Sequence, residues 1–346
     1  MRLARSRSSL VCAALLGGAL GLGCSSAGSP ASKPWRPFSS TSPWNLPLGP
    51  DPALDPDSDR LVRDLAKRGP LRINLAEWSI PVYEVDARST KGHAVRDARP
   101  GIFGAGFEFP RSIPIPGGAV ASRPEGGDMH LCIVDRQLGL EWGMWRAQKN
   151  TYGEWETGLG AVTDLRSDGV ALPFDQQERE LDAHRARASG FPLIAGLIRL
   201  EEIRAGRIEH ALVFAYDGCA PGWFVPPAST SQAPMPLTRA DGGGLPMGAR
   251  IQLDPALDLD ALALTPAGRT IARALQEYGA FCGDFAGATV LYAESSPEAL
   301  EDWQGVLDEQ LLYDVFTPDF LAEHLRVLGA RPWRPGQNFE ATRSSG

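Results

Sequence analysis

The stretch HLCIVDRQLGLEWGMW, residues 130–145, decides the fold class. Residues 130–135 and 140–145 are two short runs rich in apolar, β-branched and aromatic side chains, and Gly139 lies between them. Two such runs joined by a few residues with a glycine are typical of a β-hairpin. We therefore predict an antiparallel hairpin at the centre of the chain.

Outward from this hairpin, further strands are predicted at residues 78–85, 152–165, 208–216 and 250–253, with a Gly- and Pro-interrupted β region at 103–115. Helices are predicted between Asp57 and Gly69 and at residues 175–188, 266–278, 297–312 and 318–328. Strands dominate the middle, helices the ends, and βαβ alternation is missing. This order predicts a β-rich α+β domain with a mostly antiparallel sheet, for which a two-sheet sandwich or jelly-roll-like core with peripheral helices is one arrangement.

The first 23 residues have the composition of an export signal. Three arginines precede an uncharged stretch at residues 10–23 that is too short to span a bilayer as a helix. The segment LGLGC, ending at Cys24, resembles a bacterial lipobox, in which the cysteine becomes the lipidated first residue of the mature chain. Ordinary signal cleavage nearby is the alternative. We expect a protein of the periplasm or cell surface, attached to the membrane only through a lipid on Cys24.

The rest of the chain divides into three parts on composition. Residues 24–42 are rich in Ser and Pro, which is typical of a tether, and residues 331–346 read as a flexible tail. No second linker interrupts the sequence between them. Residues 43–330 are therefore predicted to form a single globular domain.

Charge and composition exclude several classes of protein. The 346-residue chain has a net charge of −8, and loss of residues 1–23 removes three basic residues and no acid, which takes it to −11. A chain with this negative charge lacks the positive electrostatic potential that binds the phosphates of nucleic acid. Hydrophobic residues make up 43% and charged residues 22%, which is typical of a globular protein and excludes a multi-span membrane protein.

The cysteines support no metal site. Once Cys12 leaves with the signal and Cys24 carries the lipid, Cys132, Cys219 and Cys282 remain, which permits one disulfide and one thiol in an oxidising compartment. No Cys/His spacing typical of structural zinc occurs. No dinucleotide fingerprint or phosphate loop occurs either, and we expect no cofactor.

Asp128 and His130 are the first candidate catalytic residues. Side chains alternate across a strand, so these two face the same side, together with Cys132 and Val134. A carboxylate beside an imidazole can fix its tautomer or raise its basicity, as general acid–base catalysis requires. The alternative is a polar strand end in which the histidine is merely hydrogen bonded.

His210 is the second candidate. It shares the face of Leu212 and Phe214, which we expect to be covered, and a covered imidazole needs a partner. A core histidine with its hydrogen bonds satisfied is the alternative.

Acidic residues supply the third group of candidates. Asp164 follows a Gly-rich strand, where acids can act as general acid and base for glycosidic cleavage. Asp168-Gly169 is better explained as a turn. Glu202 is placed in a short helical turn that aims it inward, and Asp284 is a weaker candidate of the same kind as Asp164.

A cluster of aromatic residues is the fourth feature. Aromatic faces stack on sugar rings while neighbouring polar groups bond to hydroxyls. Packing into the core explains one or two aromatic residues of a strand more readily than four so close together. The four are Trp142, Trp145, Tyr152 and Trp155.

Together these segments resemble a widespread set of exported bacterial proteins whose motifs occur in the same order. The resemblance implies a single shared domain over most of residues 43–290 and adds weight to the Asp, Glu and His residues inside the motifs. The matching segments are Ser42-Pro43-Trp44-Asn45, Asp128-Met129-His130, residues 158–167, residues 196–206, Ile208-Glu209-His210-Ala211-Leu212, Pro246-Met247-Gly248-Ala249-Arg250, and Ala274-Leu275-Gln276-Glu277-Tyr278-Gly279 with Asp284.

Export, β-rich architecture, the aromatic cluster and the dispersed acids predict a lipoprotein that cleaves a polysaccharide. As a hydrolase it would use Asp128 and Asp164 as the acid–base pair, with His130 and His210 as orienting groups and the tryptophans as a sugar platform. As a lyase it would use His210 with a tyrosine to abstract a proton next to a uronate carboxylate. The acidic chain disfavours a polyanionic substrate, so hydrolysis is preferred.

Two alternatives belong to other classes. A non-catalytic lipoprotein that binds a carbohydrate or another partner would keep the aromatic platform without paired acids. A metal-dependent hydrolase would hold its ion with Asp128, His130 and His210.

Overall fold

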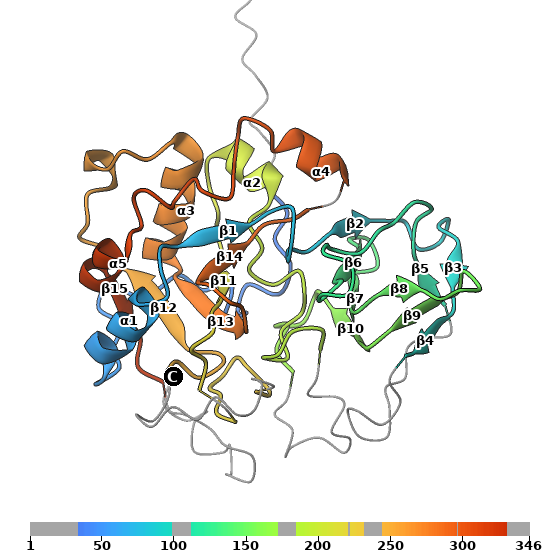
Figure 1. Ribbon diagram of the computed structural model, residues 1–346, viewed down its shortest axis with the longest axis horizontal. Helices are drawn as coiled ribbons and strands as arrows, with labels where there is room; N and C mark the ends of the chain where they lie inside the picture. The colour runs from blue at the N-terminus through green and yellow to red at the C-terminus, as the bar shows by residue number, and fades with distance from the viewer. Residues whose placement is uncertain are drawn as a thin grey trace, which may run out of the picture. The chain divides into compact units, whose positions relative to one another are not determined.

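The computed structural model describes residues 34–98, 112–171, 185–220, 222–231, 244–295 and 297–330, all of them in one compact unit that begins at Pro34. Their strands form four sheets, and most strand pairs are antiparallel. The predicted β-rich α+β class is confirmed. The strands are divided among four sheets, however, and not between the two sheets of a sandwich (Figure 1).

The larger sheet has six strands in the order β1-β14-β11-β13-β12-β15. Its pairs β1–β14 and β11–β13 are parallel, and the others are antiparallel. The central strands are buried on both faces, as their continuous apolar sequences require. Their bounds are β1 (Arg72–Asn74), β11 (Leu212–Ala215), β12 (Arg250–Leu253), β13 (Ala280–Asp284), β14 (Val290–Tyr292) and β15 (Leu325–Val327).

The second sheet has four strands in the order β10-β7-β6-β2 and contains the predicted hairpin. Asp135 at the end of β6 pairs with Leu140 at the start of β7, and Gly139 has a φ of 68°, which an L side chain rarely adopts. The bounds are β2 (Val82–Glu84), β6 (Leu131–Asp135), β7 (Leu140–Trp145) and β10 (Leu159–Asp164).

Two small sheets and the helices complete the described fold. The small sheets pair β3 (Gly92–His93) with β5 (Ile113–Pro114), and β9 (Trp155–Thr157) with β4 (Val95–Asp97) and β8 (Gln148–Lys149). The helices are α1 (Ser58–Ala66), α2 (Leu200–Ala205), α3 (Pro266–Glu277), α4 (Pro297–Asp302) and α5 (Pro318–His324). In Figure 1 the helices accompany the six-stranded sheet, and α1 and α3 contact its β15 and β12 strands.

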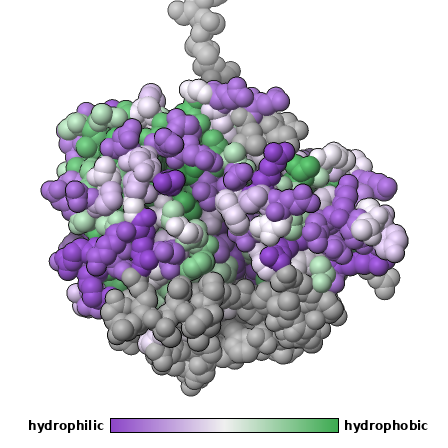
Figure 2. Space-filling model, viewed as in Figure 1, coloured by the Kyte–Doolittle hydropathy of each residue, from purple (hydrophilic) through white to green (hydrophobic). Residues whose placement is uncertain are grey.

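Strand β6 separates two hydrophobic cores. Cys132 and Val134 point into the large core beneath the six-stranded sheet, whereas Leu131 and Ile133 point into a second core. This alternation is the one predicted for the segment that follows His130. Among the coloured residues in Figure 2, hydrophilic ones predominate, and hydrophobic ones form smaller patches.

Two predicted helices end earlier than the sequence pattern indicates. Residues 325–327 continue from α5 as strand β15, because their backbone pairs with β12. Helix α4 ends at Asp302, where residues 303–306 turn and Trp303 is buried. Of the predicted surface helix at 175–188, the described residues 185–188 are not helical, and Arg187 is almost fully buried.

The folded body starts before the predicted boundary at residue 43. Trp35 lies under the guanidinium groups of Arg136 and Arg199, with 4.4 and 4.9 Å between each guanidinium carbon and the ring centroid. The backbone N–H of Phe38 donates to the carbonyl oxygen of Leu165 at 2.8 Å. Residues 34–42 are therefore packed against the domain and do not belong to a tether.

Candidate functional site

The segment from Arg185 to Ala195 links the two large sheets. The backbone N–H of Ser189 donates to Gly283 of β13, and the backbone N–H of Leu193 donates to the Glu141 carboxylate on β7 at 2.7 Å. Because it bonds to both sheets, this segment brings polar side chains from β6, β7, β13 and β14 to one place.

His130 is one of the most buried groups of this cluster, with 1% of its surface exposed. Its Nε2 lies 3.1 Å from the carbonyl oxygen of Ala186. A carbonyl oxygen only accepts, so Nε2 carries the proton and Nδ1 is a lone-pair acceptor. The pKa of His130 is lowered to about 4, chiefly by burial and in addition by the positive charge of Arg187, although the charge of Asp128 acts in the opposite direction. The imidazole is therefore neutral at pH 7, and among the described residues its buried Nδ1 has no hydrogen-bond partner.

Arg187 and Asp284 face each other across the cluster. Arg187 Nη1 lies 4.0 Å from Asp284 Oδ2, and its guanidinium carbon lies 4.4 Å from the centroid of the Tyr292 ring. The pKa of Asp284 is raised to about 7, chiefly by burial and in addition by the charge of Asp128, although Arg187 acts in the opposite direction. Near neutral pH Asp284 is consequently a proton donor in part of the molecules and a carboxylate in the rest.

Glu141 is a second carboxyl group with a raised pKa. It is 1% exposed, and burial raises its pKa to about 7 despite the hydrogen bond from the Leu193 N–H. Its Oε2 has no partner among the described residues. Buried polar atoms in native proteins are normally paired, so such atoms mark a place for water or ligand.

Asp128 lies at the exposed rim of the cluster. Its Oδ1 accepts a hydrogen bond from Trp145 Nε1 at 3.1 Å, and its side chain is half-buried. The ring of Trp78, which is 43% exposed, packs on Gly127, where an added Cβ would come within 2.9 Å of it. One indole, from β7, therefore bonds Asp128, and a second, from the turn before β2, lies on the neighbouring Gly127.

The predicted pairing of Asp128 with Asp164 is wrong. Asp164 pairs with Leu140 at one end of the β7–β10 ladder, whereas Asp128 is bonded to Trp145 at the other end. A strand of six residues spans about 17 Å between its ends, beyond the carboxyl separations of glycosidases. Asp164 is exposed, and its carboxylate accepts a hydrogen bond from the backbone N–H of Arg166, as an aspartate at the start of a turn does.

His210 and Glu202 form a separate buried pair. His210 Nε2 lies 3.0 Å from Glu202 Oε1, and Glu202 Oε2 accepts the backbone N–H of Arg199 at the start of α2. Among the described residues, the contacts of His210 share no partner with those of His130. The described residues contain no group of three His, Cys, Asp or Glu side chains that could hold a metal ion, so the hypothesis that Asp128, His130 and His210 hold one is wrong. Both ring nitrogens of His210 are hydrogen bonded, to Glu202 and to the carbonyl oxygen of Ala211, and its role as a lyase base stays a prediction.

The aromatic cluster does not form a platform. Trp142 and Trp155 are each 5% exposed and belong to the second core, so their role is packing. Tyr152 is 87% exposed on a turn. Of the four, only Trp145 reaches the polar cluster.

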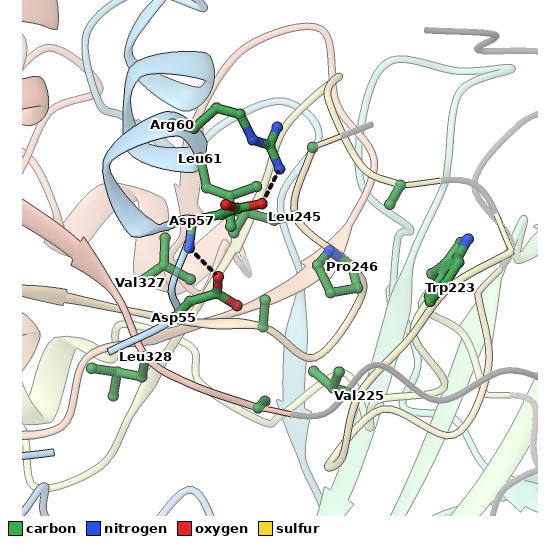
Figure 3. Close-up of a pocket in the computed structure, with 14 residues that line it drawn as sticks. Asp55, Asp57, Arg60, Leu61, Trp223, Val225, Leu245, Pro246, Val327 and Leu328 are labelled. Atoms are coloured by element: carbon green, nitrogen blue, oxygen red, sulfur yellow. Dashed lines mark hydrogen bonds and ion pairs between the residues drawn. The ribbon is translucent and has the colours of Figure 1, made fainter. Parts of the chain in front are cut away.

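A pocket of about 190 Å³ lies elsewhere, between the N-terminal end of α1 and residues 244–249 (Figure 3). Trp223 and Leu245 form part of its wall. Its carboxylates bond locally: Asp55 Oδ1 accepts the backbone N–H of Asp57, and Asp57 is paired with Arg60 at 3.1 Å. This pocket shares no lining residue with the polar cluster of Asp128, His130, Glu141, Arg187 and Asp284. The polar cluster is the better candidate for an active site.

Sequence reasoning missed Trp78, Glu141 and Arg187 and gave Asp284 too little weight. A signal existed for Glu141, the one charged residue in the otherwise apolar run at residues 140–145. Arg187 gave none, because it lies in a polar run typical of a surface helix.

Comparisons with protein families, curated proteins and solved structures found no match to this chain. None of the helices in the described residues is long and apolar enough to cross a membrane, and no three His, Cys, Asp or Glu side chains there are grouped to hold a metal ion. Cys24 and the predicted signal lie outside the described residues.

Proposed function

We propose that the chain is an exported, lipid-anchored enzyme that hydrolyses glycosidic bonds in a polysaccharide, with Asp284 as the proton donor and Asp128 as the partner carboxylate. The observation that carries the proposal is the convergence of these two acids, Asp128 at the rim and Asp284 with 14% of its side chain exposed and a pKa of about 7. When two carboxyl groups lie in different environments, their pKa values differ, and one can donate a proton while the other stays ionised.

The chemistry assigns one step to each acid. Asp284 donates its proton to the glycosidic oxygen as the bond to the anomeric carbon breaks, and Asp128 supplies the negative charge that the oxocarbenium-like transition state requires. A water molecule then bonds through its oxygen to the anomeric carbon and gives up a proton to the Asp284 carboxylate, which restores the acid. Arg187 is a positioning residue, since its charge at 4.0 Å keeps the pKa of Asp284 from rising further.

The surroundings support a sugar as the substrate. The exposed ring of Trp78 offers a face on which a sugar can stack, and Trp145 orients Asp128 through its Nε1. The unprotonated Nδ1 of His130 is a buried acceptor suited to a hydroxyl donor.

The test is an assay of the purified protein on a panel of neutral and acidic polysaccharides, scoring new reducing ends and, separately, unsaturated sugar products. We expect reducing ends without unsaturation. Loss of a general acid typically costs a factor of about 10² to 10⁴, so Asp284→Asn should lower kcat by that amount. Asp164→Asn is the matched control, an exposed aspartate on the same protein, and should retain activity.

Three results would contradict the proposal. Equal losses in Asp284→Asn and Asp164→Asn would remove Asp284 from the reaction. Unsaturated products would indicate a lyase. Retained glycan binding without any cleavage would indicate the non-catalytic carbohydrate-binding alternative.

A further inference from the structure

Two cysteines meet in the interior beside the six-stranded sheet. Cys219 follows β11 in a turn, and Cys282 lies within β13, the parallel neighbour of β11. Their Sγ atoms are 3.6 Å apart, and both residues are completely buried. A disulfide needs about 2.05 Å between the sulfur atoms, so the two must approach by about 1.5 Å to close one.

We propose that Cys219 and Cys282 form a disulfide when the chain folds in an oxidising environment, and that Cys132 remains a thiol. Cys132 lies on β6 in the other large sheet, next to Glu141 and Arg187. Of the three cysteines, Cys219 and Cys282 therefore form the pair, because their sulfur atoms are in contact, and Cys132 is left as a single thiol.

The bond forms by exchange with a small disulfide such as oxidised glutathione. The thiolate of one cysteine attacks a glutathione sulfur and releases one glutathione thiol; the second cysteine then displaces the other glutathione. Two cysteine thiols lose their hydrogens and two electrons, and one glutathione disulfide becomes two thiols. Because both sulfurs are inaccessible in the folded protein, exchange is expected before the core closes.

The bond would fasten the turn at residues 217–220 to the strand that carries Asp284. Cys219 Sγ already lies 3.5 Å from the backbone oxygen of Asp284, and Ala220, its neighbour, lines the pocket of Figure 3. The disulfide therefore fixes the backbone of the proposed proton donor.

The test maps the cysteines of the wild-type chain. Urea-unfolded, fully reduced protein is refolded in a mixture of reduced and oxidised glutathione, and its free thiols are blocked with iodoacetamide in denaturant. The protein is then reduced, and the released thiols are labelled with N-ethylmaleimide. Mass spectrometry of the peptides reads each cysteine separately, including Cys12 and Cys24.

The maleimide label is expected on Cys219 and Cys282, with iodoacetamide on Cys132. In Cys132→Ser the pair should still carry maleimide, whereas in Cys219→Ser the label should disappear from Cys282. Iodoacetamide on both Cys219 and Cys282 of the wild type, or a bond that includes Cys132, would overturn the proposal. Since the wild-type map decides, failure of a variant to fold does not alter the conclusion.

Discussion

Replacing Asp284 by Asn should stabilise the protein at alkaline pH. A carboxyl group whose pKa rises from 3.8 to about 7 on folding holds its proton more tightly in the folded state. Stability is therefore lost as the pH rises from about 4 to about 7, and above pH 7 the ionised group costs the folded state its full penalty. At about 1.4 kcal/mol for each tenfold change in proton affinity, that penalty is ~4 kcal/mol.

An amide of the same shape carries no charge at any of these pH values. The difference in unfolding free energy between Asp284→Asn and wild type should be small at pH 4.5 and grow to at most ~4 kcal/mol in favour of the variant at pH 8. The gain in stability is at most ~4 kcal/mol because the amide of the variant loses the attraction between the Asp284 carboxylate and Arg187. Glu141 also titrates near pH 7, but it is present in both proteins, so its contribution cancels in the difference.

Urea unfolding followed by tryptophan fluorescence at pH 4.5, 6 and 8 measures this difference. Asp164→Asn, at an exposed turn, is the control and should show a difference that does not change with pH. If the variant at position 284 is instead less stable than wild type at pH 8, Asp284 is stabilised as a carboxylate, and the assignment of a proton donor fails.

Further predictions concern other parts of the molecule. His130→Ala should abolish most glycan cleavage while Tyr152→Ala, at an exposed turn, should not; initial rates of reducing-end formation test this. Trp44→Ala removes a fully buried ring that packs edge-on against Phe191 with centroids 5.0 Å apart, and should cost about 3–5 kcal/mol in urea unfolding. Burial opposes the charge on His210, but Glu202 raises the pKa of His210 overall, so the ion pair stabilises the fold below pH 6.5 and this stabilisation is lost as the pH rises. His210→Gln should therefore lower the unfolding free energy by ~3 kcal/mol at pH 5.5 and by less at pH 9, measured by urea unfolding. Closing the Cys219–Cys282 loop, whose ends are 63 positions apart, should raise stability by up to ~4 kcal/mol, and equal urea midpoints for reduced and oxidised protein would contradict this.

Local signals predicted the elements whose pattern is complete within a few residues. The β6–β7 hairpin followed from two apolar runs and Gly139, and α3 begins at Pro266 after a capping Thr265, as its sequence indicates. Strand β15 was wrongly assigned to a helix because its pairing with β12 joins residues far apart in the chain. Its side-chain pattern alone is also compatible with a helix.

The site was predicted only in part, for a related reason. Asp128 and His130 stand two positions apart, and the charge of Asp128 acts on the His130 imidazole. Strand alternation does not explain this, because residues 128–130 precede β6 and Met129 has a φ of 41°. Choosing Asp284 over Asp164 as the second acid required knowing which strand ends meet, and no spacing within the chain contains that information. Arg187 is buried because Asp284 and the Tyr292 ring receive its charge, a compensation visible only after folding.

The first and last described segments of the body are hydrogen bonded to each other. Leu54 forms a bridge with Leu328, and the backbone N–H of Asp55 donates to Val327 in β15. A chain that emerges N-terminus first, from a ribosome or through a membrane channel, cannot complete this edge until residues 327 and 328 have emerged. Such a high contact order predicts slow, late closure, so nascent molecules would expose apolar surface to chaperones or proteases throughout their passage.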